Sequence, residues 1–102
     1  SPEFGVFVSS RIEFIIYNAL QKSGLKFKYE APLQLEKLSY KIHPDFTIYL
    51  RDGKELYWEH LGMLDTRKYY NDWQERKDNY NNHNLKDCLI TTDDLNGRIL
   101  LL

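Results

Sequence analysis

Residues 43–62 read HPDFTIYLRDGKELYWEHLG, two extended segments on either side of the turn-forming pair Asp52-Gly53. Both segments are rich in β-branched and aromatic residues, and Asp-Gly is typical of tight turns, so we expect an antiparallel hairpin. Each strand also holds a carboxylate among apolar neighbours, Asp45 in the first strand and Glu59 in the second. A buried charge is costly unless it is compensated, which makes these two residues the first candidates for a functional site.

The length of the turn decides whether the two carboxylates can meet. A two-residue Asp52-Gly53 turn would set Asp45 opposite His60 and leave Glu59 on the other face. A three-residue loop over residues 51–53, with Gly53 left-handed, sets Asp45 directly opposite Glu59. Only this second register lets the pair share a divalent cation, for which carboxylate oxygens are preferred ligands.

Two helices are predicted on either side of the hairpin. Apolar residues recur at helical spacing over residues 10–22, where Ser10 and Glu13 fit a capping box and Gly24 marks the end. Over residues 66–81 the recurring residues are largely aromatic. We interpret these aromatic residues as core rather than as a platform for stacking bases: Tyr69, Tyr70, Trp73 and Tyr80.

The predicted order of elements is α-β-β-β-α-β. The second helix is long enough to cross the sheet, so the last strand should run parallel to a neighbour. We therefore expect an α/β (α+β) fold with a mixed sheet of about four strands and helices packed on it. The strands are expected at residues 26–31, 40–50, 55–61 and 85–92, and residues 33–39 are expected to form a loop.

Composition limits the class of protein. The chain has 102 residues, a net charge of −1 and a single cysteine, Cys88, which we expect to be a small buried hydrophobe. A disulfide framework is excluded and a reducing, cytoplasmic compartment is expected. No run is apolar enough to span a membrane. Residues 1–4 have the character of an expression-tag scar, and residues 5–102 are expected to be one domain cut from a longer protein.

The arrangement of motifs resembles the PD-(D/E)xK nuclease superfamily. In that superfamily a helix with an acidic residue comes first, a Pro-Asp pair then opens a strand, and the next strand of the hairpin carries a Glu. Glu13, Pro44-Asp45 and Glu59 match these positions. The predicted element order matches the superfamily core over nearly the whole chain. The run WEHLGM at residues 58–63, followed by aromatic residues and a lysine at helical spacing, is similar to nuclease-like regions attached to some bacterial helicases.

This resemblance implies a phosphodiesterase that depends on Mg²⁺ or Mn²⁺ and acts on nucleic acid, with DNA as the first expectation. Asp45, Glu59 and the backbone carbonyl of His60 would bind the ion, and Glu13 would be the accessory acid found in many members. The ion would polarise the scissile phosphate and activate a water molecule. Fusion to a helicase or to other domains is also implied.

The lysine of the superfamily pattern is missing, because Leu61 stands two residues after Glu59. Some members carry this lysine on the following helix, and Lys77 is our candidate, with Lys68 as the runner-up. We expect Lys77 to lie over the sheet within reach of the acidic pair, and Lys68 and Arg76 to be more exposed.

Two other classes of function stay open. The first is a catalytically inactive module of the same fold that binds nucleic acid or a partner protein. The missing lysine and the weak net charge favour this hypothesis. A plain interaction domain could form a homodimer through its apolar C-terminal residues. Single residues also have simpler interpretations: Glu13 as a helix cap, Asp45 as a strand-entry residue, His60 as a packed histidine and Lys77 as a lysine at the edge of a core stripe.

Overall fold

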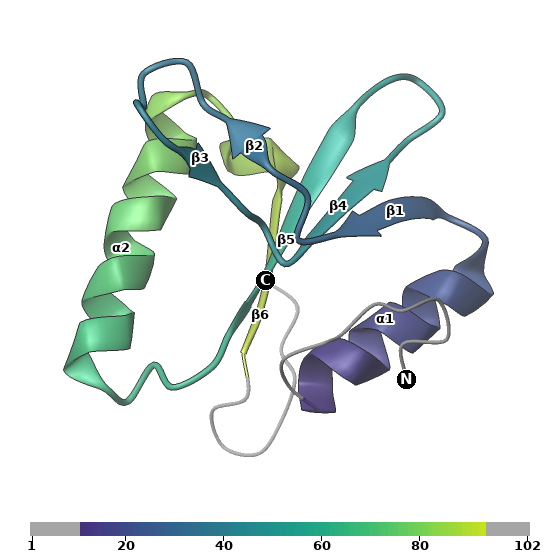
Figure 1. The fold of residues 1–102 in the computed structure, drawn as a ribbon, viewed down its shortest axis with the longest axis horizontal. Helices are drawn as coiled ribbons and strands as arrows, with labels where there is room; N and C mark the ends of the chain where they lie inside the picture. Colours follow the sequence, from purple (N-terminus) through teal and green to yellow (C-terminus); the bar gives the residue numbers. More distant parts are fainter. Residues whose placement is uncertain (1–10, 94–102) are drawn as a thin grey trace.

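The hairpin forms the middle of a mixed sheet. The structure is a computed structural model that describes residues 11–93. Strands β4 (Phe46–Tyr49) and β5 (Glu55–Leu61) pair antiparallel, β1 (Lys26–Tyr29) pairs antiparallel with β4, and β6 (Leu89–Asp93) pairs parallel with β5. The strand order is β1-β4-β5-β6 (Figure 1). The expected α+β class, the mixed four-stranded sheet and the parallel last strand are confirmed.

The turn between β4 and β5 has three residues. Phe46 pairs with Trp58, and the backbone N–H of Leu50 donates to the carbonyl of Lys54 at 2.8 Å, which leaves residues 51–53 as the loop. Gly53 closes this loop with a φ of +89°. The register that sets Asp45 opposite Glu59 is therefore the observed one, and the two-residue alternative is wrong.

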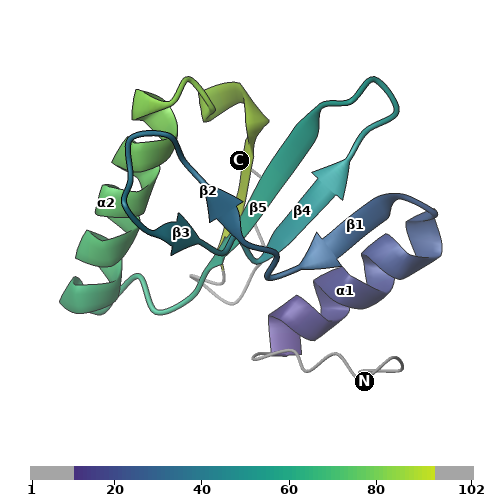
Figure 2. The same ribbon diagram turned by 45° about the horizontal axis from the view of Figure 1, so that its top comes forward.

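The helices α1 (Arg11–Ser23) and α2 (Arg67–Asn82) lie on opposite sides of the sheet (Figures 1 and 2). Successive residues of a strand point to opposite faces, so each strand contributes to both sides. On one side Phe46 and Ile48 pack against α1. On the other side Tyr57 of β5 packs against Tyr80 of α2. Neither helix has the length and apolar character needed to cross a membrane.

A small second sheet covers part of the α2 side and was not predicted. Strands β2 (Leu33–Gln34) and β3 (Lys41–Ile42) pair antiparallel where we expected a loop and the start of a longer strand. The chain leaves β3 at His43-Pro44, because proline has no N–H to donate and restricts the residue before it. Leu35 and Ile42 are buried with Tyr57 and Tyr80.

The last strand also begins later than predicted. A short 3₁₀ helix, η1 (Lys86–Cys88), precedes β6, and Cys88 is half-buried rather than buried. Helix α1 is described from Arg11, one residue beyond the predicted start. The capping residue Ser10 and the apolar C-terminal residues that suggested a dimer lie outside the described residues.

We expect Gly53→Ala to destabilise the chain by about 1–2 kcal/mol, because a Cβ is disfavoured at a left-handed φ. A Cβ at this position would meet no atom within 4 Å, so the cost is conformational and not steric. Gly53→Asn should cost less, since asparagine tolerates this region of φ. Urea denaturation of the three chains measures the difference. Equal stability of Gly53→Ala and wild type would show that the loop does not need a left-handed residue.

Candidate functional site

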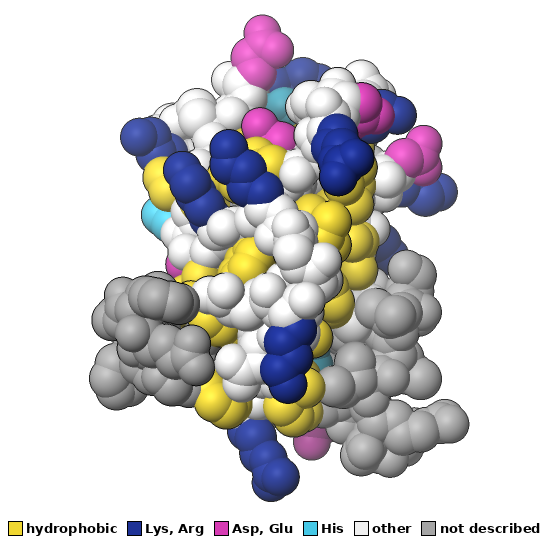
Figure 3. All heavy atoms as spheres, turned by 90° about the vertical axis from the view of Figure 1, so that its right-hand side faces the viewer, with side chains coloured by type: hydrophobic (Ala, Val, Ile, Leu, Met, Phe, Trp, Pro, Cys, Tyr) yellow, Lys and Arg dark blue, Asp and Glu magenta, His cyan; other side chains and the backbone are white. Residues whose placement is uncertain are grey.

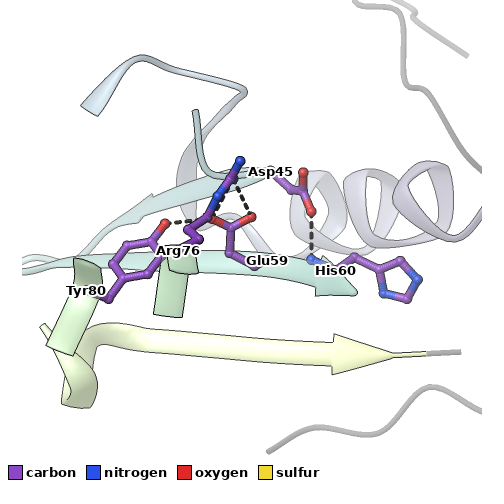
Figure 4. Close-up of polar contacts among 5 residues, drawn as sticks. All are labelled: Asp45, Glu59, His60, Arg76 and Tyr80. Atoms are coloured by element: carbon purple, nitrogen blue, oxygen red, sulfur yellow. Dashed lines mark hydrogen bonds and ion pairs between the residues drawn. The ribbon is translucent and has the colours of Figure 1, made fainter. Parts of the chain in front are cut away.

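Asp45 and Glu59 lie together on the side of the sheet that faces α2. Asp45 directly precedes β4, and the register of β4 with β5 sets it across from Glu59. Its Oδ2 accepts a hydrogen bond of 2.6 Å from the backbone N–H of His60. Figure 4 shows both carboxylates on the same side of β5. The hairpin thus brings together the two acids that the sequence singled out.

Glu59 is held by two side chains of α2. Its side chain is 5 % exposed; Arg76 Nη1 lies 3.1 Å from each carboxylate oxygen, and the Tyr80 hydroxyl donates to Oε2 at 2.7 Å (Figure 4). Burial raises the pKa of the Glu59 carboxyl, while the charge of Arg76 and the bond from Tyr80 act in the opposite direction. Burial and the neighbouring Glu59 raise the pKa of Tyr80, so its hydroxyl stays a donor.

Asp45 is the more perturbed of the two acids. Burial, and then the charge of Glu59, raise the pKa of Asp45 to about 7, although the bond from the His60 N–H lowers it. The charge of Glu13 adds to the increase. Glu13 is itself buried on α1 and accepts a 2.7 Å hydrogen bond from the Tyr29 hydroxyl. Glu59 and Glu13 thus both act on Asp45, and the opposing effect of Arg76 does not cancel theirs.

A cavity of about 200 Å³ opens beside the pair, between the end of β5 and α2. Asp45, Glu59, Arg76, Tyr69 and Trp73 are among the residues that line it. It is large enough for a hydrated ion or a phosphate group. A larger hollow of about 700 Å³ lies along β1 and is lined by neither Asp45 nor Glu59, so the smaller cavity is the one that adjoins the acidic pair.

The donor chemistry of the pair fits a hard divalent cation, because two carboxylates with excess negative charge face one cavity. Within residues 11–93 no three side chains of His, Cys, Asp or Glu are grouped closely enough to hold a metal ion. A site made of Asp45, Glu59 and a backbone carbonyl does not need a third side chain. Since Arg76 now contacts both oxygens of Glu59, an ion could use this carboxylate only if Arg76 moved.

The predicted position of Lys77 is wrong. Lys77 is exposed, and the basic side chain that reaches Glu59 is that of Arg76. The aromatic stripe predicted the opposite, with Arg76 more exposed than Lys77. Lys68 is also exposed and pairs with Asp72 at 2.9 Å. Arg76 stands three residues after Trp73 and Lys77 four residues after it, so helical spacing sets both beside the aromatic stripe and does not distinguish them.

The other aromatic and histidine assignments are mixed. Tyr80 is fully buried, as predicted, whereas Tyr69 and Tyr70 are 46 % and 48 % exposed and do not belong to the core. The His60 Nδ1 lies 2.8 Å from the Thr92 hydroxyl, which also accepts a bond from Trp58 Nε1. His60 is thus a hydrogen-bonded packing residue, and its backbone is the part that contacts Asp45.

No protein-family model, curated protein or solved structure matches this chain. The function of the chain must therefore be inferred from the geometry and chemistry of the site.

The free energy of unfolding should depend on pH through Asp45. Its carboxyl has a higher pKa in the folded chain, about 7, than its ordinary 3.8, so its contribution to stability is full below about pH 4 and is lost as the pH rises through 7. Asp45→Asn keeps an oxygen to accept from the His60 N–H but cannot ionise. In EDTA, the stability of this variant relative to wild type should increase by a few kcal/mol from about pH 4 to pH 8. Urea denaturation at several pH values tests this, and parallel profiles would contradict it.

Arg76→Met should destabilise the chain while Lys77→Met should not. Loss of one partner of a buried ion pair costs about 3–5 kcal/mol, but the Arg76 side chain is 39 % exposed, so we expect about 1–3 kcal/mol. Lys77→Met is the matched control and should change stability by less than about 0.5 kcal/mol. Adding Glu59→Gln to Arg76→Met should recover part of the loss. Equal effects of the two single variants in urea denaturation would show that Arg76 is not the partner that matters.

Proposed function

We propose that this chain is a metal-dependent nuclease of the PD-(D/E)xK type that hydrolyses phosphodiester bonds, with DNA as its substrate. In this proposal Asp45, Glu59 and the carbonyl of His60 hold Mg²⁺ or Mn²⁺. The observation that carries the proposal is the register of β4 and β5, which sets two mutually repelling carboxylates side by side at a cavity. Arg76 offsets part of this repulsion, and a divalent cation bound between the two carboxylates would offset more of it.

The residues of the chain have separate roles in this proposal. The ion, when bound, would supply a Lewis acid for the phosphate and for a water nucleophile. Glu13, fixed by Tyr29, adds negative charge that favours cation binding. Arg76 lies at the wall of the same cavity, where its guanidinium could donate to a phosphate once it leaves Glu59. Arg76 thus takes the part that the sequence pattern assigned to Lys77.

Basic side chains on the same side of the sheet support a nucleic-acid substrate. Lys28 pairs with Thr47 and Lys26 with Tyr49, which puts both lysines on the face that carries Asp45 and Glu59. Their ammonium groups lie 5.9 and 5.8 Å from the centroid of the Tyr49 ring. Figure 3 displays the side of the molecule away from α2, where Lys and Arg side chains lie over the upper part among Asp and Glu side chains. A local basic surface can thus exist in spite of the net charge of −1.

One observation favours the inactive module as a second candidate. Arg76 already compensates Glu59, at 3.1 Å from both oxygens, so part of the charge that would attract an ion is offset within the chain. The chain also has Leu61 where the superfamily pattern has lysine. In this candidate the same site binds nucleic acid or a partner protein without cutting. Both proposals include a cytoplasmic location and attachment to a helicase or other domains. The single cysteine supports the cytoplasmic location.

A nuclease assay with matched variants tests the proposal. The wild-type chain, purified in parallel with Glu59→Gln and Asp45→Asn, is incubated with single- and double-stranded DNA and RNA in Mg²⁺, Mn²⁺ or EDTA. We expect cleavage that needs the metal and falls about 100-fold or more in each variant, because each loses a metal ligand. Glu75→Gln, which changes an exposed acid on α2, is the control and should cut like wild type, as should Lys77→Met. Cleavage that survives both carboxylate variants would rule the proposal out, and metal-independent binding without cleavage would favour the inactive module.

A further inference from the structure

Two tyrosines at the start of α2 are exposed, although aromatic rings are normally buried. Tyr69 is 46 % and Tyr70 is 48 % exposed, while Tyr80 on the same helix is fully buried. Tyr40 is exposed to a similar degree, at 52 %, so exposure alone does not mark a binding site.

Only one of the two tyrosines borders the candidate site. Tyr69 lines the cavity of about 200 Å³ together with Asp45, Glu59 and Arg76, and Tyr70 does not line it. The ammonium group of Lys68 lies 5.5 Å from the centroid of the Tyr69 ring. Lys68 is also paired with Asp72 at 2.9 Å, so its charge is already offset. An exposed aromatic ring and a cavity of phosphate size therefore occur in one place.

We propose that Tyr69 is a stacking platform for an unpaired base of a single-stranded nucleic acid whose neighbouring phosphate enters the cavity. This inference rests on the proposed function, because it takes the cavity as the place where a phosphodiester is held. It adds the substrate class: a single strand, or an unpaired end or junction of a duplex. Stacking on an aromatic ring tolerates any base, because every base has a π-face.

Base pairing would block this contact. In a duplex both faces of each base are covered by their neighbours, so a ring at the surface of the protein can reach a base only when the strand is unpaired. The charge of the chain agrees with this preference. A net charge of −1 provides little of the sequence-independent attraction that binding to a duplex backbone requires. Stacking supplies affinity that does not depend on a large excess of positive charge.

Fluorescence anisotropy tests the platform separately from cleavage. The probes are fluorescein-labelled oligo-dT and oligo-U of about 12 nucleotides, in the range of known single-strand sites, and a duplex of the same length. The whole chain is used, once in EDTA and once in Ca²⁺, a hard cation that carboxylates also bind, and gel electrophoresis verifies that the oligonucleotides stay intact. The variants are Tyr69→Ala, Tyr69→Phe and Tyr69→Trp, with Tyr70→Ala as the matched control from the same helical turn, and circular dichroism verifies that each one folds.

We expect the wild-type chain to bind single strands more tightly than the duplex. Tyr69→Ala should raise the Kd for single strands about fivefold or more, the effect of losing one stacked base. Tyr69→Phe and Tyr69→Trp should bind like wild type or more tightly, because the ring and not the hydroxyl makes the contact. Tyr70→Ala should also bind like wild type.

Binding that is unchanged in Tyr69→Ala, or equally lowered in Tyr69→Ala and Tyr70→Ala, would overturn the inference, as would equal affinity for duplex and single strand. The two proposals can fail separately. If the chain cleaves DNA with metal but Tyr69→Ala binds single strands like wild type, the nuclease proposal is supported and the stacking proposal is wrong. Single-strand binding that depends on Tyr69, in a chain that cuts no polymer, would support the platform and end the nuclease proposal.

Discussion

The buried carboxylate of Glu59 is the constraint on which the arrangement of this molecule depends. It lies in the interior of a central strand, where an uncompensated charge would be costly. Both of its side-chain donors, Arg76 and Tyr80, come from α2, so the helix and β5 are linked by a charge as well as by apolar contacts. This link sets the position of α2 over the sheet and forms one wall of the cavity beside Asp45.

The same contact bears on both proposed functions. The charge of Glu13 acts on Asp45 and on Glu59, and the guanidinium of Arg76 offsets part of the negative charge. A divalent cation and Arg76 would compete for the oxygens of Glu59. In the proposed function, the activity of the site would depend on whether the cation or Arg76 holds this carboxylate.

Much of the fold is set by local patterns. The strands β4 and β5, the loop closed by Gly53, both helices and the parallel β6 depend on periodicity and turn chemistry, which act over a few residues. The pairing of β2 with β3 was missed because two-residue strands have no period that can be recognised. The break at Pro44 was visible in the sequence, but a single long strand fitted the apolar residues on both sides equally well.

For the site, the hairpin sequence limited the register to two alternatives, because the turn could have two or three residues. The structure shows the three-residue loop, which sets Asp45 opposite Glu59. The partner of Glu59 was decided by tertiary structure. Around a helix axis, Arg76 and Lys77 lie about 50° to either side of the line through Trp73 and Tyr80, so helical spacing does not distinguish them. The position of β5 beneath α2 turns Arg76 toward the carboxylate and leaves Lys77 in solvent. Tyr69 on the same helix is exposed beside the cavity, whereas Tyr80 is buried against Tyr57.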